Sequence, residues 1–90
     1  MRVEWRPRAE RRLDKIHEFI SKDSIDAADF VQEAILAAAA TLPDHPLVYR
    51  QGRVPNTREM VVLPNYMIVY RVKRDRIQIV NVLHARQRYP

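Results

Sequence analysis

The chain has 90 residues, of which 47% are hydrophobic and 30% are charged, and it carries a formal net charge of +5. This composition excludes disorder and predicts a single globular domain over residues 1–90. The absence of cysteine excludes disulfides, thiolate nucleophiles and cysteine metal sites, and it fits a cytoplasmic protein.

The N-terminal part of the chain predicts a strand followed by a helix. Polar and apolar residues alternate from Arg2 to Trp5, and Pro7 suits the first turn of a helix. A helix over about Pro7 to Ser21 then carries one apolar stripe, formed by Ala9, Leu13, Ile16 and Ile20. Its outer face is basic, with Arg8, Arg11, Arg12 and Lys15. The charges near the N-terminus fit no secretory signal.

A second helix is predicted after the capping residues Asp23 and Ser24, and Pro43 ends it. Its buried face is expected to consist of Ala27, Val31, Ala34, Ile35, Ala38 and Leu42. The two helices should form a hairpin. The apolar run inside the second helix is shorter than the roughly 18 residues that a membrane span requires, so we expect no membrane contact.

Three strands are predicted in the second half, after loop-like segments at 43–46 and 51–56. They run over about Arg58 to Leu63, Tyr66 to Lys73 and Ile77 to His84, and their short links favour antiparallel hairpins. Alternation in the last strand predicts one face with Ile77, Ile79, Asn81 and Leu83, and another with Gln78, Val80, Val82 and His84. The chain is therefore expected to be an α+β protein of order β-α-α-β-β-β. Its helical hairpin would pack on a mainly antiparallel four-stranded sheet.

Charge is divided unevenly along the chain. Every formal charge between residues 23 and 49 is acidic, whereas from residue 50 onward nearly all are basic, with Glu59 and Asp75 as the exceptions. The cationic field therefore belongs to the sheet and its flanks. Such a field favours a polyanion or an acidic protein as partner.

Several chemistries lack the residues that they need. His17, His45 and His84 lie in different elements without acidic companions at metal-ligand spacing, so no metal site is expected. A chain with one glycine cannot build a phosphate-binding loop, so no nucleotide cofactor is expected either. Ser21 and Ser24 are explained by helix capping rather than by nucleophilic catalysis.

Three segments in order, Thr57-Arg58-Glu59, 65–72 and 82–86, together with the helical hairpin, resemble the RelE/ParE superfamily of toxins from bacterial type II toxin-antitoxin modules. The ParE branch is the most similar. The resemblance implies growth inhibition by poisoning DNA gyrase through protein contact, without enzymatic turnover, and a part in plasmid stabilization. It also implies these target-binding residues: Arg8, Arg11, Arg12, Lys15, Arg86, Gln87, Arg88 and Tyr89.

Two other functions stay open at this point. One is a RelE-type, ribosome-dependent mRNA endonuclease, whose proton transfer and phosphate stabilisation would fall to Arg58, His84, Arg86 and Tyr89. In that branch an expected arginine corresponds to Met67, and Glu59 is a further candidate for the acid-base set. The other is a non-toxic basic RNA-binding or adaptor domain.

Either toxin function implies a cognate acidic antitoxin that forms a hetero-oligomer with the chain. The cationic residues of the sheet expected to bind it are Arg58, Arg71, Arg74 and Arg76. By resemblance, the antitoxin carries the DNA-binding domain, so operator DNA would be contacted only indirectly. Simpler roles are open for several of these side chains: His84 ending a strand, and Arg58 forming a surface ion pair with Glu59.

Overall fold

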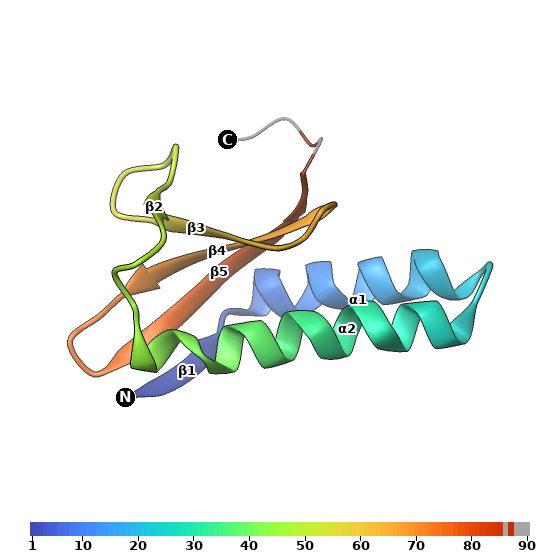
Figure 1. Cartoon of the computed structure of the whole chain (residues 1–90), viewed down its shortest axis with the longest axis horizontal. Helices are drawn as coiled ribbons and strands as arrows, with labels where there is room; N and C mark the ends of the chain where they lie inside the picture. Colours follow the sequence, from blue (N-terminus) through green and yellow to red (C-terminus); the bar gives the residue numbers. More distant parts are fainter. Residues whose placement is uncertain (86, 88–90) are drawn as a thin grey trace.

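The computed structural model describes residues 1–85 and 87 and contains two helices packed on one face of a five-stranded sheet (Figure 1). The elements are β1 (Arg2–Trp5), α1 (Pro7–Ser21), α2 (Ile25–Ala40), the 3₁₀ turn η1 (Leu42–Asp44), β2 (Arg50–Gln51), β3 (Arg58–Leu63), β4 (Tyr66–Val72) and β5 (Arg76–His84). The strand order is β1-β5-β4-β3-β2. The predicted α+β fold is confirmed.

Strand β2 was not predicted, because two residues show no alternation. Arg50 and Gln51 pair with Glu59 and Arg58 and extend the sheet by one short edge strand. Strand β1 lies at the other edge and runs parallel to β5, with Val3 opposite Ile77. All other neighbouring strands are antiparallel.

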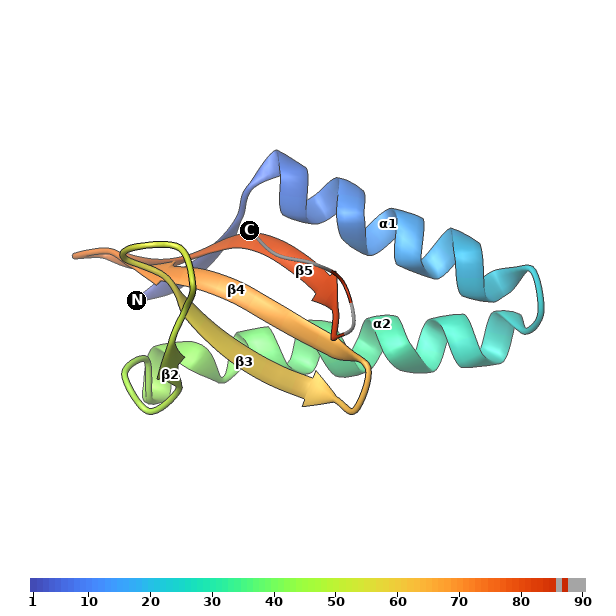
Figure 2. The same ribbon diagram turned by 90° about the horizontal axis from the view of Figure 1, so that it is seen from above.

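Both helices form as their apolar spacing predicts. Pro7 opens α1, and the Ser24 side chain caps α2 by accepting a hydrogen bond from the Ala27 amide at 3.1 Å. Ala27 itself is exposed, so its assignment to the buried face was wrong. Ala28 takes that place because it lies seven residues, or about two turns, before the buried Ile35. Figure 2 shows the two helices diverging over the sheet from their shared turn.

A β-bulge at Val80 changes the faces of the last strand. Val69 pairs with Asn81 but Tyr70 pairs with Ile79, so β5 contains one extra residue at this point. Val82 consequently joins Ile77 and Ile79 in the main core, while Leu83 packs with Met67 and Val69 on the opposite face. The strict alternation expected from the sequence is therefore wrong beyond Val80.

The main core lies between the helices and the sheet. Its largest fully buried side chain is Tyr70, whose hydroxyl donates a 2.7 Å hydrogen bond to the Pro46 carbonyl oxygen. Tyr66 and Trp5 pack against the same cluster, as the alternation of β4 and β1 predicts. The Pro46 contact ties the segment after η1 to the sheet. No helix among the described residues is long and apolar enough to span a membrane.

Tyr70 should make the stability of the protein depend on alkaline pH. Burial raises its pKa above the ordinary value of about 10, so the unfolded chain ionises first and stability is lost as the pH rises above 10. Replacing Tyr70 by Phe should cost about 1 kcal/mol near pH 8 through the lost hydrogen bond. This difference should shrink above pH 10. Urea unfolding of both proteins between pH 8 and 11 measures it, and a constant difference would refute this role for Tyr70.

Candidate functional site

Helix α1 presents a basic face to solvent because its apolar stripe is turned toward the sheet. Ala9 and Leu13 are buried in the core, while Arg8, Arg11 and Lys15 are exposed. These three cations lie on the sides of the helix that the sheet does not cover. The predicted basic exterior of this helix is thus confirmed for Arg8, Arg11 and Lys15.

Arg12 differs from its basic neighbours because it crosses from α1 to the end of the sheet. Its Nε donates to the Val82 carbonyl oxygen at 3.4 Å, and its Nη2 donates to Oε1 of Gln87 at 2.5 Å. The side chain is therefore half-buried, and the guanidinium connects the helix to the residues after β5. The Arg12 side chain is therefore not simply an exposed charge on the surface of α1.

A cleft opens where α1 passes the end of the sheet. We call it the α1 cleft: Arg12, Lys15, Ile16 and Phe19 form one wall, and Tyr66, His84 and Gln87 form the other. Its volume is about 220 Å³. Phe19 is 71% exposed, and the rings of Tyr66 and His84 meet edge to face with centroids 5.5 Å apart. The structure thus brings together Arg12, Lys15, His84 and Gln87, which the sequence had placed in separate elements.

The lining of the α1 cleft combines positive charge with aromatic surface. Cations and aromatic rings line it, and none of its described lining residues carries a carboxylate. Aromatic side chains and arginine are enriched at protein–protein interfaces. Within the described part of the chain, no group of three or more potential metal ligands occurs.

Of the residues suggested for RNA cleavage, the two that the structure describes, Arg58 and His84, do not converge. Arg58 pairs with Tyr70 near the end of β4, whereas His84 pairs with Tyr66 at the start of β4. The two side chains therefore lie at opposite ends of the sheet, which is wrong for a joint role at one phosphate. Arg86, Arg88 and Tyr89 lie outside the described residues.

Glu59 does not form the expected surface pair with Arg58. Its side chain is only 2% exposed and accepts hydrogen bonds from Arg50 Nε and the Arg53 amide, both at 3.1 Å. Neighbouring residues of a strand point to opposite faces, so Arg58 and Glu59 cannot meet. Glu59 therefore has a structural role in holding the segment before β3.

The four cations predicted to bind an antitoxin have different surroundings. Arg76 is already paired with Glu4 at 3.2 Å and with Asp75 at 2.8 Å. The pKa of Glu4 is lowered by its hydrogen bonds from Gln78 and then Arg76, and the Arg76 hydrogen bond lowers the pKa of Asp75.

Arg58 instead donates through Nη1 to the carbonyl oxygens of Leu47 and Tyr49, at 3.2 and 2.7 Å. Arg71 is half-buried, and Arg74 is exposed in the β4–β5 hairpin. The charges of Arg58, Arg71 and Arg74 are not neutralised by an ion pair within the described part of the chain. Of the four cations predicted to bind an antitoxin, these three, rather than Arg76, therefore carry a positive charge that is available to a partner.

Phe19 was not predicted as a site residue, although the sequence contains a signal for it. It falls outside the stripe of Ala9, Leu13, Ile16 and Ile20, so a large aromatic side chain had to lie on the border of the buried face. In the structure this side chain lies on the wall of the α1 cleft.

The fold and the α1 cleft describe a small basic α+β protein, and comparison with known proteins assigns it to the RelE/ParE superfamily of toxins. The family model described as the ParE toxin of the type II toxin-antitoxin system parDE matches residues 3–89. The chain belongs to this family of ParE toxins. It is therefore the toxin component of a type II toxin-antitoxin system, and the resemblance seen in the sequence is confirmed.

Individual relatives agree with this assignment. The chain is 44% identical to a Sinorhizobium fredii protein named "Putative toxin Y4kP", with 99% of this chain and 93% of the relative covered. It is 34% identical to "Toxin RelE2" of Caulobacter vibrioides, over 92% and 93% of the two chains.

Among solved structures, a chain of the chromosomal ParDE system from P. aeruginosa matches with a TM-score of 0.83 at 22% identity. The match covers 93% of this chain and 95% of that one. HP0894 from Helicobacter pylori matches with a TM-score of 0.61 at 15% identity, covering 94% of each chain. At these identities the two structures show the shared fold.

Proposed function

We propose that this toxin inhibits growth by binding DNA gyrase through the α1 cleft and the basic face of α1, without turning over a substrate. The observation that carries this proposal is the junction of Arg12, Lys15 and the exposed Phe19 in one cleft. An arginine and an aromatic ring around a partly apolar hollow suit a protein partner. Gyrase as the target is suggested by membership of the ParE family.

An mRNA nuclease receives less support from the geometry. RNA cleavage needs a proton acceptor, a proton donor and cations around one phosphate. Arg58 and His84 stand at opposite ends of β4, so they cannot serve the same phosphate. A binding toxin requires no such convergence, and it is the function that we favour.

The proposal includes a cognate acidic antitoxin that neutralises the toxin by covering its cationic surface. The unneutralised charges of Arg58, Arg71 and Arg74 supply an attraction for such a partner. We expect the proposed action to occur in the cytoplasm, because gyrase and a cytosolic antitoxin would be its partners. The antitoxin, rather than the toxin, would contact operator DNA. A plasmid-stabilising role would follow from loss of the antitoxin.

Controlled expression of the chain in bacteria tests the proposed function. A reporter of the DNA-damage response and sequencing of RNA 5′ ends are read in one culture. We expect growth arrest with a damage response and unchanged transcripts, because stalled gyrase breaks DNA. New 5′ ends within translated codons would instead support the nuclease. Co-expression of the proposed cognate antitoxin should restore growth.

A further inference from the structure

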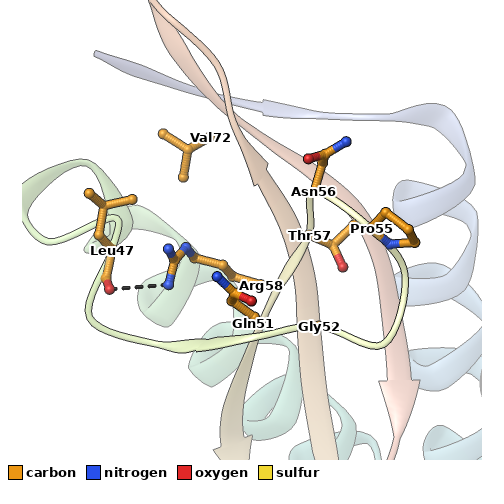
Figure 3. A pocket seen from close by; sticks show the side chains of 8 residues that line it. All are labelled: Leu47, Gln51, Gly52, Pro55, Asn56, Thr57, Arg58 and Val72. Carbon is orange, nitrogen blue, oxygen red and sulfur yellow. Dashed lines mark hydrogen bonds between the residues drawn. The ribbon is translucent and has the colours of Figure 1, made fainter.

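A second pocket lies at the other end of the sheet from the α1 cleft. It is bounded by Leu47, by the segment from Gln51 to Arg58, and by Val72 at the end of β4 (Figure 3). Its volume is about 370 Å³, enough for one or two amino-acid side chains. Leu47 is 65% exposed and Val72 is 37% exposed, so two aliphatic side chains flank the opening.

The loop between β2 and β3, which forms part of the pocket wall, is held in place by its own hydrogen bonds. The Gly52 amide donates to the Thr57 carbonyl oxygen at 2.7 Å, and the Thr57 hydroxyl donates to the Val54 carbonyl oxygen at 2.7 Å. Asn56 adopts a φ of 64°, a left-handed conformation that asparagine tolerates in turns.

Arg58 supplies the charge of this pocket. Only its Nη1 is engaged, by two carbonyl oxygens, which leaves Nε and Nη2 without an acceptor among the residues that the structure describes. In Figure 3 the guanidinium reaches toward Leu47, with the Gln51 side chain beside it. None of the lining residues that the structure describes is acidic. A cation held this way attracts a carboxylate from outside the chain.

The remaining lining residues decide which carboxylate fits. Leu47, Pro55 and Val72 offer aliphatic surface, and Gln51 and Asn56 offer amide groups. Of the described residues that line the pocket, none is aromatic, so these residues offer a nucleobase nothing to stack on. A carboxylate on a short aliphatic stem satisfies both parts of the pocket, and this is the chemistry of a glutamate side chain.

We propose that this pocket binds a glutamate side chain of an extended antitoxin segment. The edge strand β2 includes Gln51, so a segment that added to this edge would bring its side chains to the opening. The site is separate from the α1 cleft, since Arg58 and His84 lie at opposite ends of the sheet. The inference rests on the proposed antitoxin but not on gyrase as target.

The test is a titration of the ¹⁵N-labelled full chain with blocked peptides, followed by NMR. Acetyl-Leu-Glu-Val-amide carries one side-chain carboxylate, and acetyl-Leu-Gln-Val-amide is its neutral match. We expect saturating shifts at the amides of Gly52, Asn56 and Thr57, and about tenfold tighter binding of the glutamate peptide. Equal binding of the two peptides would overturn the proposal. So would tighter binding of inorganic phosphate, or of acetyl-Leu-Val-Leu with a free C-terminal carboxylate.

Variants of exposed residues make the test independent of folding. Leu47→Asp should place a carboxylate beside Arg58 and weaken binding of the glutamate peptide at least about tenfold. Val48→Asp is the matched control, because Val48 is 68% exposed and does not line the pocket. Equal losses in the two variants would contradict the pocket. The titration does not measure toxicity, so its failure leaves the gyrase proposal standing, and failure of the gyrase assay leaves this one standing.

Discussion

Reversing the two cations of the α1 cleft should abolish toxicity. The double substitution Arg12→Glu with Lys15→Glu replaces attraction for the target by repulsion, which costs several kcal/mol across a protein interface. We therefore expect target affinity to fall at least about a hundredfold, with normal growth at expression levels where the wild-type chain arrests cells. Colony counts after induction, at matched protein levels, measure the effect.

The control for this experiment carries the same change in net charge at another place. Lys73 and Arg74 are both exposed in the β4–β5 hairpin, and neither side chain forms an ion pair with a described residue. Their reversal to glutamate should leave toxicity in place. Equal loss in the two double variants would mean that overall charge, rather than the α1 cleft, governs toxicity.

Arg12 also donates hydrogen bonds to Val82 and Gln87, so its replacement could lower toxicity by destabilising the fold. Lys15→Glu alone separates the two effects, because Lys15 is exposed and makes no hydrogen bond or ion pair with a described residue. Its thermal unfolding should match that of the wild-type chain while its toxicity falls. Phe19→Ser gives an uncharged companion variant that removes the exposed ring from the same cleft.

Replacing Glu59 by Ala should cost about 2 to 3 kcal/mol of folding free energy. The substitution removes the acceptor of the Arg53 amide and the partner of Arg50, and it leaves space in a buried position. Arg50 is 59% exposed and can return to water, so the loss comes mainly from the buried side of the pair. For a domain of this size, the midpoint of thermal unfolding should fall by about 10 to 20 °C.

Two further variants define the cause of this loss. Glu59→Gln keeps the shape and one acceptor oxygen, so it should cost about 1 kcal/mol. Glu33→Ala removes an exposed carboxylate on α2 and should change stability by less than about 0.5 kcal/mol. Hydrogen exchange should accelerate first in residues 50–57 of Glu59→Ala. If Glu59→Ala were as stable as Glu33→Ala, Glu59 would not be the residue that fixes this segment.

The helices and the three long strands could be predicted because local spacing determines them. Leu13 and Ile35 lie on apolar stripes of period 3.6, and Ser24 marks a helix start through its capping oxygen. The bulge at Val80 could not be predicted, since valine is an ordinary strand residue and the bulge arises from the register with β4. The faces of β5 beyond this point depend on that register.

The candidate site was predictable in part of its residues, which included Arg12 and Lys15 but not Phe19, and it was not predictable in its arrangement. The basic face of α1 follows from helical periodicity, whereas the contact of Arg12 with Gln87 joins residues 75 positions apart. The burial of Glu59 has the same origin, because its partner Arg50 lies on a two-residue strand that no pattern announces. Pairings between distant segments decide which charges meet, and one sequence contains no local sign of them.

The most direct test of the proposed function uses the purified chain with DNA gyrase and plasmid DNA. Gyrase relaxes and supercoils the plasmid through a transient double-strand break, and a bound poison should trap that broken state. We expect linear DNA after protein digestion, in amounts that rise with the wild-type chain and fall to background with Arg12→Glu and Lys15→Glu. Undisturbed supercoiling at toxin concentrations well above those of gyrase would contradict gyrase as the target.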